Sequence, residues 1–149
     1  MTPAVEAAKN ARIGYRLHAY DGVDLGDGDY ALAVAARLEI DPRRLFKTLV
    51  ASVDGKLQVF VVPSDRQLSL KAAGKRAVLA SPVEAERATG YVLGGISPLG
   101  QRRPLPTSID DSALEHETIL VSAGRRGLQI ELDPRDLVTL TNASVRSLA

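Results

Sequence analysis

A glycine-rich stretch at residues 90–100, with the sequence GYVLGGISPLG, is the first candidate for a binding site. Four glycines and one proline occur in these eleven residues. Glycine tolerates positive φ and lets a ligand approach the main chain because it has no Cβ, and proline fixes φ at one point of the loop. Backbone N–H groups in such a loop can hold an oxyanion, a phosphate or a small polar ligand. A plain turn has the same composition, so the loop alone does not decide between binding and connection.

Lys47 is the second candidate, because it shares a strand face with apolar residues. The segments 46–53 and 56–62, joined by an Asp-Gly pair, predict a β-hairpin. Alternate residues of a strand share a face, which places Lys47 with Leu49 and Ala51. Such a lysine either reaches water through its long side chain or holds a cation at the mouth of a pocket. The strand pattern leaves both interpretations open.

The other chemistry-bearing residues exclude several classes of enzyme. The chain has no cysteine, so it has no thiolate nucleophile and no cysteine metal site. Its two histidines, His18 and His116, lack metal-ligand spacing, and a Ser–His–Asp triad would need one of them. The glycines of 90–100 fit neither a P-loop nor a dinucleotide fingerprint, and the acidic residues of 21–29 lack the spacing of a calcium loop. We therefore expect no metal and no cofactor, and an enzyme here would depend on main-chain donors, a lysine, hydroxyls and the substrate itself.

Periodicity and capping residues predict the elements that would position these groups. We expect helices at 3–11, 30–38, 68–76, 82–89 and 134–140, a helical turn at 112–117, an extended segment at 102–111, and strands at 15–20, 46–53, 56–62, 77–80, 118–122 and 127–132, with 77–80 buried. Two hairpin-like pairs indicate antiparallel pairing, and the elements do not alternate as in a doubly wound sheet. The sequence predicts one α+β domain over residues 1–149, with a mixed, mostly antiparallel sheet and flanking helices.

The charge of the chain is close to neutral but unevenly distributed. The formal net charge is +1, yet residues 42–76 hold eight basic and two acidic residues, while 1–41 and 77–149 are net negative. The middle segment is therefore a candidate surface for an anionic partner. The sequence begins without a signal-peptide pattern and contains no apolar run of about 18 residues. We expect a cytoplasmic protein that does not insert into a membrane.

Several of these segments together resemble the YbaK/EbsC family of free-standing trans-editing domains, which deacylate mischarged tRNA. The resemblance covers nearly the whole chain. It is carried by the segments MTPAV at 1–5, FKTL at 46–49, TGY at 89–91, GGISPLG at 94–100, and the late hairpin at 121–132. The glycine-rich segment is specific, and its order with the Lys-Thr strand and the late hairpin matches the family.

The resemblance implies a substrate, a mechanism and a set of site residues. The substrate would be the acceptor end of tRNA(Pro) wrongly carrying cysteine, and prolyl-tRNA synthetase is an implied partner. The thiol of that cysteine would attack the aminoacyl carbonyl and release the tRNA. The resemblance assigns catalysis to Lys47, Gly94 and Gly95, and substrate binding to Tyr20, Thr48, Ile96, Ser97, Pro98 and Ser122.

Two departures and two alternatives remain. Some relatives have Asp where Gln129 stands, which removes any role for a carboxylate there. Related domains that clear Ala-tRNA(Pro) carry a histidine in the segment aligned with 122–124, and none is present here, which favours cysteine. The alternatives are an editing domain for another amino acid, such as alanine, and a non-catalytic module that binds nucleotide or RNA.

Overall fold

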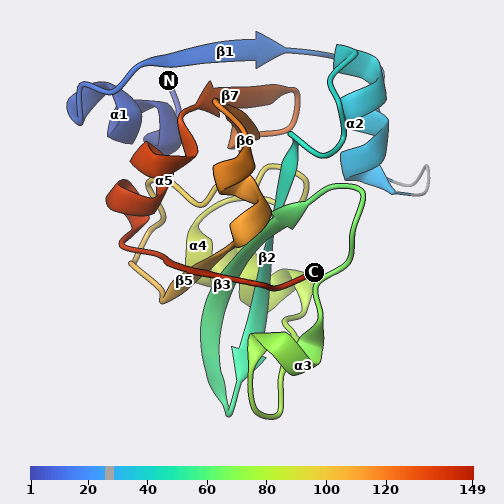
Figure 1. The fold of residues 1–149 in the computed structure, drawn as a ribbon, viewed down its shortest axis with the longest axis vertical. Coiled ribbons are helices and arrows are strands. Elements are labelled where there is room, and N and C mark those ends of the chain that lie inside the picture. Colours follow the sequence, from blue (N-terminus) through green and yellow to red (C-terminus); the bar gives the residue numbers. More distant parts are fainter. Residues whose placement is uncertain (26–28) are drawn as a thin grey trace.

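The computed structural model of the chain describes residues 1–25 and 29–149. The central part of the acidic loop 21–29 therefore lies outside the described residues. None of the helices in the described part is long and apolar enough to cross a membrane. Figure 1 shows a small sheet at one end of the molecule and a long hairpin that runs away from it.

The strands form two sheets, and most neighbouring strands pair antiparallel. The small sheet has the order β1-β7-β6 and is antiparallel throughout, whereas the larger has the order β4-β2-β3-β5-β8, with β3–β5 and β5–β8 parallel. The strands are β1 (Tyr15–Ala19), β2 (Phe46–Val53), β3 (Lys56–Pro63), β4 (Val78–Leu79), β5 (Thr107–Asp110), β6 (Ile119–Arg125), β7 (Leu128–Leu132) and β8 (Ser144–Arg146). The predicted α+β class with mixed, mostly antiparallel pairing is confirmed, although the strands divide between two sheets.

The helices begin where the sequence supplies capping groups. They are α1 (Pro3–Asn10), α2 (Tyr30–Leu38), α3 (Leu70–Ala73), α4 (Pro82–Thr89), α5 (Pro134–Thr141) and a 3-10 turn, η1 (Asp111–Glu115). The Thr2 side chain accepts a hydrogen bond from the amide of Val5, and Ser81 and Glu84 form a capping box on α4. These contacts satisfy amides that a helix N-terminus leaves without partners.

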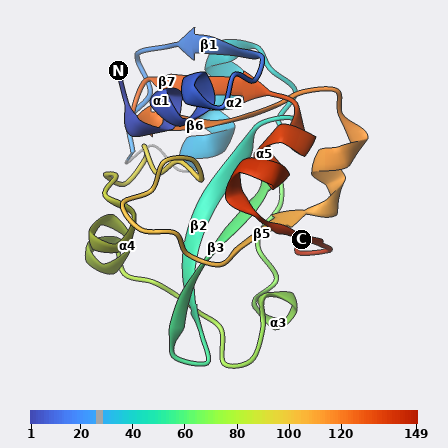
Figure 2. The same ribbon diagram turned by 90° about the vertical axis from the view of Figure 1, so that its left-hand side faces the viewer.

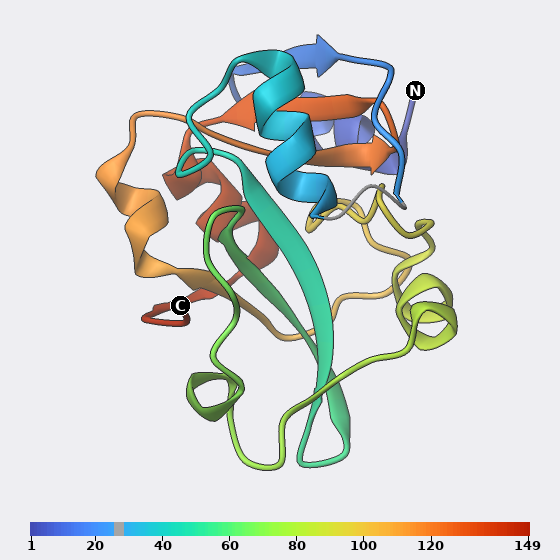
Figure 3. The same cartoon turned by 90° about the vertical axis from the view of Figure 1, so that its right-hand side faces the viewer.

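The small sheet lies between α1 and α2, as Figure 2 and Figure 3 show from two sides. Strand alternation explains the arrangement. On β6, Val121 belongs to the main core together with Ala4 and Val5 of α1. Leu120 faces the other way and packs with Val34 of α2. Ser122, two residues after Leu120, lies on the same face of β6, so its side chain is also directed toward α2.

The β2–β3 hairpin alternates in the same manner. Val50 of β2 packs into the main core, whereas Leu49 and Ala51 belong to a second cluster with Phe60. The predicted sharing of one face by Lys47, Leu49 and Ala51 agrees with this division. The hairpin thus lies between the main core on one face and the second cluster on the other. Successive residues at the start of β2 therefore point to opposite faces of the hairpin.

Three local predictions were wrong or incomplete. The helix expected at 68–76 is confined to α3, because Gly74 ends it with a φ of +148°. The strand expected to be buried at 77–80 is β4, a two-residue edge strand whose Val78 and Leu79 are 62% and 53% exposed. The extended segment 102–111 contains β5, and β8 was not predicted, since parallel pairing between distant segments has no local sequence signal.

A hydrogen-bonded network around Glu131 joins the two sheets. On β7, Glu131 accepts from His18 of β1 at 2.8 Å and from Thr118 at 2.5 Å. Arg44, just before β2, donates to Glu131 at 3.0 Å and to the Thr118 hydroxyl at 2.7 Å. The neighbouring Leu45 forms an isolated parallel bridge with Leu120. The ion pair therefore fixes the position of β2 against the small sheet.

This network should make stability depend on pH. Burial raises the pKa of Glu131, but the hydrogen bonds from Thr118 and His18 and the charge of Arg44 outweigh it, so that the pKa is lowered from 4.5. A carboxyl group with a lowered folded-state pKa stabilises the fold above its unfolded pKa, and that contribution is lost as pH falls through the folded value.

We expect Glu131→Gln to lower the free energy of unfolding at pH 7 by about 1–3 kcal/mol. The deficit relative to wild type should shrink as pH falls below about 4.5, because wild type then loses the same charge. Urea titrations between pH 3 and pH 7 measure this difference. Glu117→Gln, an exposed neighbour, is the matched control, and an equal loss in both variants would contradict the role of the network.

Candidate active site

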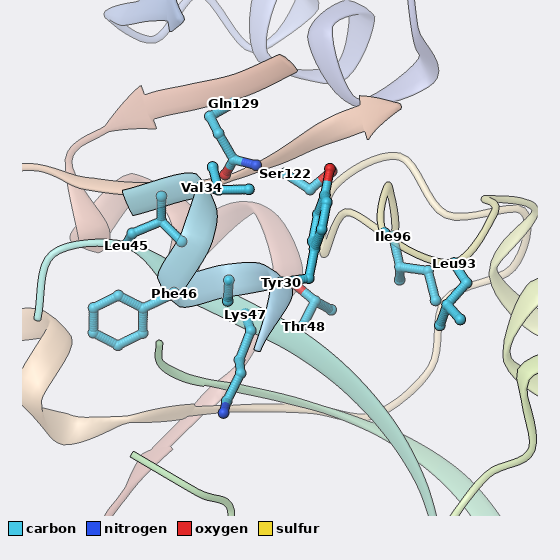
Figure 4. A pocket seen from close by; sticks show the side chains of 12 residues that line it. Tyr30, Val34, Leu45, Phe46, Lys47, Thr48, Leu93, Ile96, Ser122 and Gln129 are labelled. Atoms are coloured by element: carbon cyan, nitrogen blue, oxygen red, sulfur yellow. The ribbon is translucent and has the colours of Figure 1, made fainter. Parts of the chain in front are cut away.

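A pocket of about 100 Å³ lies where α2, the start of β2, the glycine-rich loop and the small sheet meet. Since one water molecule needs roughly 10–15 Å³ of such space, the pocket has room for several water molecules or for a small organic group such as an aminoacyl moiety. Figure 4 shows its lining side chains. The lining residues are Tyr30, Ala31, Val34, Leu45, Phe46, Lys47, Thr48, Leu93, Gly94, Ile96, Ser122 and Gln129.

Lys47 lies at the edge of this pocket. Its side chain points away from Ser122 and Gln129 (Figure 4), as expected because Lys47 and Thr48 are consecutive residues of one strand. Lys47 is partly buried, and within the described part of the chain it forms no ion pair. Lys47 therefore contributes to the lining of the pocket, and its ammonium group has no ionic partner in the described part of the chain that would compete with an anionic or carbonyl group of a ligand.

Two oxygen atoms among the lining residues have no hydrogen-bond partner. They are Thr48 Oγ1 and Gln129 Oε1, both buried, and neither has a partner among the residues that the structure describes. A buried polar atom without a partner costs about 1–3 kcal/mol. A ligand that donates hydrogen bonds, such as an amine, would remove that cost. These two oxygens can therefore accept hydrogen bonds from a polar ligand.

Tyr20 and Tyr30 support the Gln129 end of the pocket. The two phenol oxygens lie 3.0 Å apart and share a hydrogen bond, and Gln129 Nε2 donates to the Tyr20 oxygen at 3.4 Å. Burial, together with the hydrogen bond to Tyr20, raises the pKa of Tyr30, so its phenol remains neutral at physiological pH. Because the Gln129 amide group is held through its nitrogen, its oxygen is left for the pocket.

Gly94 and Gly95 have different positions in the loop. Gly94 lines the pocket with a φ of +83°, and its amide has no acceptor among the described residues. Gly95 does not line the pocket: its amide donates to the Val92 carbonyl at 2.9 Å. A Cβ at Gly95 would lie 2.7 Å from the Cα of Arg125. Gly94 is thus positioned to contact a ligand, and Gly95 lets the loop pack against the β6–β7 hairpin.

Of the next three loop residues, one lines the pocket and two do not. Ile96 lines the pocket and is 7% exposed. Ser97 is fully buried, and its hydroxyl accepts from the amide of Leu99 at 3.2 Å. Pro98 lines a different cavity, beside α5. The structure therefore brings Ile96 to the pocket and places Ser97 and Pro98 in the framework of the loop.

Ser122 reaches the pocket from the small sheet. It follows Leu120 on the α2-facing side of β6 and pairs with Gln129 in register. Its hydroxyl accepts from the amide of Gly124 at 3.2 Å. The lining residues that the structure describes include no histidine and no carboxylate, so neither of these usual bases is among them to activate this hydroxyl as a nucleophile.

Sequence reasoning missed Tyr30 and Leu93 as lining residues. Tyr30 is the first residue of α2, and such a position ordinarily indicates only a helix start. Leu93 is 41% exposed in the loop. An exposed leucine beside glycines was the available signal for a pocket rim, but it is a weak one because single exposed apolar residues are common.

Gly94→Val should reduce activity without unfolding the chain. Valine is strained at positive φ, and its Cβ would lie 2.7 Å from Leu25 Cδ2 and 3.2 Å from Arg126 Nε. We expect turnover of the folded protein to fall at least about tenfold, the effect of about 1.4 kcal/mol. The control is Gly55→Val, which has a φ of +84° and no neighbouring atoms within 4 Å. It should share the backbone strain and keep full activity, and equal activity in both variants would contradict the role of Gly94.

Comparisons with known proteins identify the family to which the chain belongs. Residues 27–140 match the model of the aminoacyl-tRNA editing domain. The chain is 40% identical over 119 residues to EbsC of Enterococcus faecalis, described as a "putative Cys-tRNA(Pro)/Cys-tRNA(Cys) deacylase", covering 75% of this chain and 72% of that protein. It is 27% identical over 108 residues to the uncharacterized protein YwhH of Bacillus subtilis, covering 69% of each.

Two solved structures have the same fold. The hypothetical protein APE2540 is 26% identical, with a TM-score of 0.86 over 98% of each chain. A "putative trans-editing enzyme for prolyl tRNA synthetase" is 23% identical, with a TM-score of 0.83 over 99% of this chain and 98% of the other. The resemblance inferred from the sequence is confirmed, and the chain belongs to the aminoacyl-tRNA editing domain family.

Proposed function

We propose that this protein is a trans-editing deacylase that removes cysteine from mischarged Cys-tRNA(Pro). The observation that carries the proposal is the pocket, which is lined by Lys47 and by two side-chain oxygens that have no hydrogen-bond partner among the described residues. The 40% identity to EbsC, whose description names Cys-tRNA(Pro) and Cys-tRNA(Cys), supports the same substrate class. The domain would comprise residues 1–149.

The chemistry we propose uses the substrate's own thiol. The cysteine sulfur attacks the ester carbonyl, the carbon–sulfur bond forms, and the bond from that carbon to the ribose oxygen breaks. The thiol proton ends on the ribose oxygen, and water later opens the cyclic thioester to cysteine. A well-oriented intramolecular attack can lower the barrier by roughly 7–11 kcal/mol. The protein then has to orient the ester and stabilise charge, a task that needs no histidine or carboxylate, and the described lining residues include neither.

Four of the groups that line the pocket have a role in this scheme. Thr48 Oγ1 and Gln129 Oε1 accept hydrogen bonds from the α-ammonium group, which fixes the aminoacyl moiety. The Gly94 amide lies at the pocket, where it can donate to the carbonyl oxygen as negative charge develops. Lys47 supplies a positive charge to the ester region or to the terminal phosphate. The proposed chemistry requires no metal and no cofactor.

We further propose that the protein acts in the cytoplasm on the acceptor end of tRNA(Pro), near prolyl-tRNA synthetase. That enzyme would be the source of the mischarged substrate. An editing domain that is separate from the synthetase must capture the aminoacyl-tRNA after its release or while it is still bound.

A panel of aminoacylated tRNAs tests the proposal. Purified protein should release cysteine from Cys-tRNA(Pro) well above the uncatalysed rate and spare Pro-tRNA(Pro). Including Cys-tRNA(Cys) shows whether the tRNA body is discriminated. Preferential release of alanine from Ala-tRNA(Pro) would instead establish an alanine editing domain, and tight RNA binding without any deacylation would establish a binding module. Either result would refute the cysteine deacylase.

A further inference from the structure

A groove beside α4 gathers three arginines whose guanidinium groups have no polar partner among the described residues. It has a volume of about 400 Å³ and is lined by Leu57, Glu84, Arg87, Ala88, Arg102 and Arg103. The three arginines are exposed. Within the part of the chain that the structure describes, none of their side chains donates a hydrogen bond or forms an ion pair. Their guanidinium groups are therefore available to an external anion.

Most other arginines of the chain are already held by an oxygen atom of the protein. Arg44 is paired with Glu131, and Arg146 donates to backbone and hydroxyl oxygens. The full set with such partners is Arg37, Arg43, Arg44, Arg66, Arg76, Arg125, Arg126, Arg135 and Arg146. The clustering of partnerless arginines in one groove therefore sets it apart from the rest of the surface.

The basic segment 42–76, expected from the sequence to face an anionic partner, does not form one surface. Arg43 and Arg76 are paired with neighbouring aspartates. Lys56 and Lys75 lie near the tip of the β2–β3 hairpin, which Figure 1 shows at the opposite end of the molecule from α2, and α2 contributes Tyr30, Ala31 and Val34 to the pocket. These cations are too dispersed to follow one strand of a nucleic acid that enters the pocket.

Acidic residues do not cancel the charge of the groove. Its carboxylate, Glu84, accepts the amide hydrogen of Ser81 at 3.2 Å and is thereby directed to the N-terminus of α4. A larger groove of about 750 Å³ elsewhere has the opposite character. Its charged lining residues are Arg16, Glu117, Glu131, Asp133, Arg135 and Asp136, an excess of negative charge that would repel a polyanion.

The arginine groove is connected to the pocket by the glycine-rich loop. Ile96 lines the pocket, and Arg102, six residues later, lines the groove, so the two sites are at most about 22 Å apart along the chain. The loop also closes on itself, because the amide of Arg102 donates to the Thr89 carbonyl at 2.9 Å. Figure 3 shows α4 beside this loop, with α2 on its other side. A few unpaired nucleotides can span such a distance.

We propose that Arg87, Arg102 and Arg103 bind backbone phosphates of the tRNA acceptor stem while its 3′ end occupies the pocket. The inference rests on the proposed function for the identity of the RNA. Guanidinium groups bind phosphate oxygens in a bidentate manner, and phosphate contacts position a protein on nucleic acid without reading its sequence. The groove therefore supplies affinity and orientation, and the pocket supplies amino-acid selectivity.

The test is binding of an acceptor-stem RNA hairpin that carries no amino acid to the variant R87Q/R102Q/R103Q. Glutamine keeps the polar side chain and removes the charge. We expect Kd to rise at least about tenfold at 0.1 M salt, and the slope of log K against log salt to become shallower by about 0.9 for each phosphate that the protein no longer neutralises. The matched control is R43Q/R76Q/R135Q, which removes the same charge from arginines whose side chains are 72%, 70% and 72% exposed and paired locally.

The control variant should retain the wild-type Kd and slope. Equal weakening in both variants, or no weakening in the groove variant, would overturn the inference. Because the RNA carries no aminoacyl group, this result does not depend on catalysis. If the wild-type protein deacylates nothing but the groove variant still binds RNA more weakly, the proposed function is refuted and the groove inference is supported. For an active protein, the groove variant should raise KM for Cys-tRNA(Pro) with kcat unchanged.

Discussion

Lys47→Ala is expected to abolish deacylation of Cys-tRNA(Pro), lowering kcat/KM at least about 100-fold. One preorganised donor to a developing oxyanion contributes about 2.7–4 kcal/mol, and a cation at the mouth of a small pocket acts in the same range. Since Lys47 forms no ion pair within the described residues, its removal should leave the free energy of unfolding nearly unchanged. Single-turnover deacylation, with thermal unfolding in parallel, measures both quantities.

The control for this variant is Lys56→Ala, an exposed lysine at the far end of the same hairpin. It should retain wild-type activity. Undiminished activity in Lys47→Ala would refute the role of Lys47. The kinetic parameters also separate its two possible contacts: loss in kcat indicates an interaction made in the transition state at the ester, and a rise in KM alone indicates uniform binding, as with a phosphate.

Lys47→Arg tests how closely the position of the charge is set. Arginine keeps the positive charge but replaces a compact ammonium group with a planar guanidinium group. If the ester region is the contact, activity should remain low, because a planar guanidinium group does not place its charge where the compact ammonium group did. If a phosphate is the contact, arginine should restore most of the activity, since either cation binds phosphate.

Local sequence patterns predicted most elements of the fold, because their signals lie within single segments. Thr2, Ser81 and Asp133 each begin a helix as capping theory requires. The Asp54-Gly55 turn and the alternation of the flanking strands predicted the hairpin. Strand β8 and the parallel pairing of β5 with its neighbours could not be found in this way. β5 and β8 pair across 36 residues of sequence, and the contact beside them, in which the buried Asp110 accepts the amide hydrogen of Leu148 at 2.7 Å, likewise joins residues far apart in the chain.

The pocket was predictable only in part, for a related reason. Of the residues inferred from the resemblance, Lys47, Thr48, Gly94, Ile96 and Ser122 meet at one pocket. Tyr20 lies behind them, and Gly95, Ser97 and Pro98 shape the loop instead. A motif read along the chain cannot separate residues that contact a ligand from residues that hold the loop, because neighbouring residues of a loop point in different directions. Their catalytic and binding roles remain predictions.

The second large effect concerns the substrate. Ser-tRNA(Pro) should survive under conditions in which Cys-tRNA(Pro) is fully deacylated, with rates that differ at least about 1,000-fold. Serine has nearly the same size and presents the same α-ammonium group, so the pocket should admit both. A thiol with a pKa near 8.5 supplies a small fraction of thiolate at neutral pH, and the thiolate is the nucleophile. The rate with cysteine should therefore rise with pH up to about 8.5.

Methylation of the substrate sulfur separates the effect of the thiol on the chemical step from its effect on binding. S-methylcysteinyl-tRNA(Pro) keeps the sulfur atom but cannot form a thiolate, so it should resist the enzyme as the serine ester does. Equal deacylation of the cysteine and serine esters, after subtraction of the uncatalysed rates, would refute attack by the substrate. It would require a nucleophile from the protein or an activated water molecule.

The variant Ser122→Ala tests whether the protein, and not the substrate thiol, supplies the nucleophile. Ser122 has the one aliphatic hydroxyl besides Thr48 among the described lining residues, and the pocket presents no histidine to activate either. If the substrate thiol attacks, Ser122→Ala should retain activity within about tenfold, the scale of one lost neutral hydrogen bond of roughly 1 kcal/mol. If Ser122 were the nucleophile, activity would disappear with both esters. A mild effect in Ser122→Ala, together with survival of the serine ester, leaves the thiol of the substrate as the attacking group and gives the protein the tasks of holding, orienting and polarising the ester.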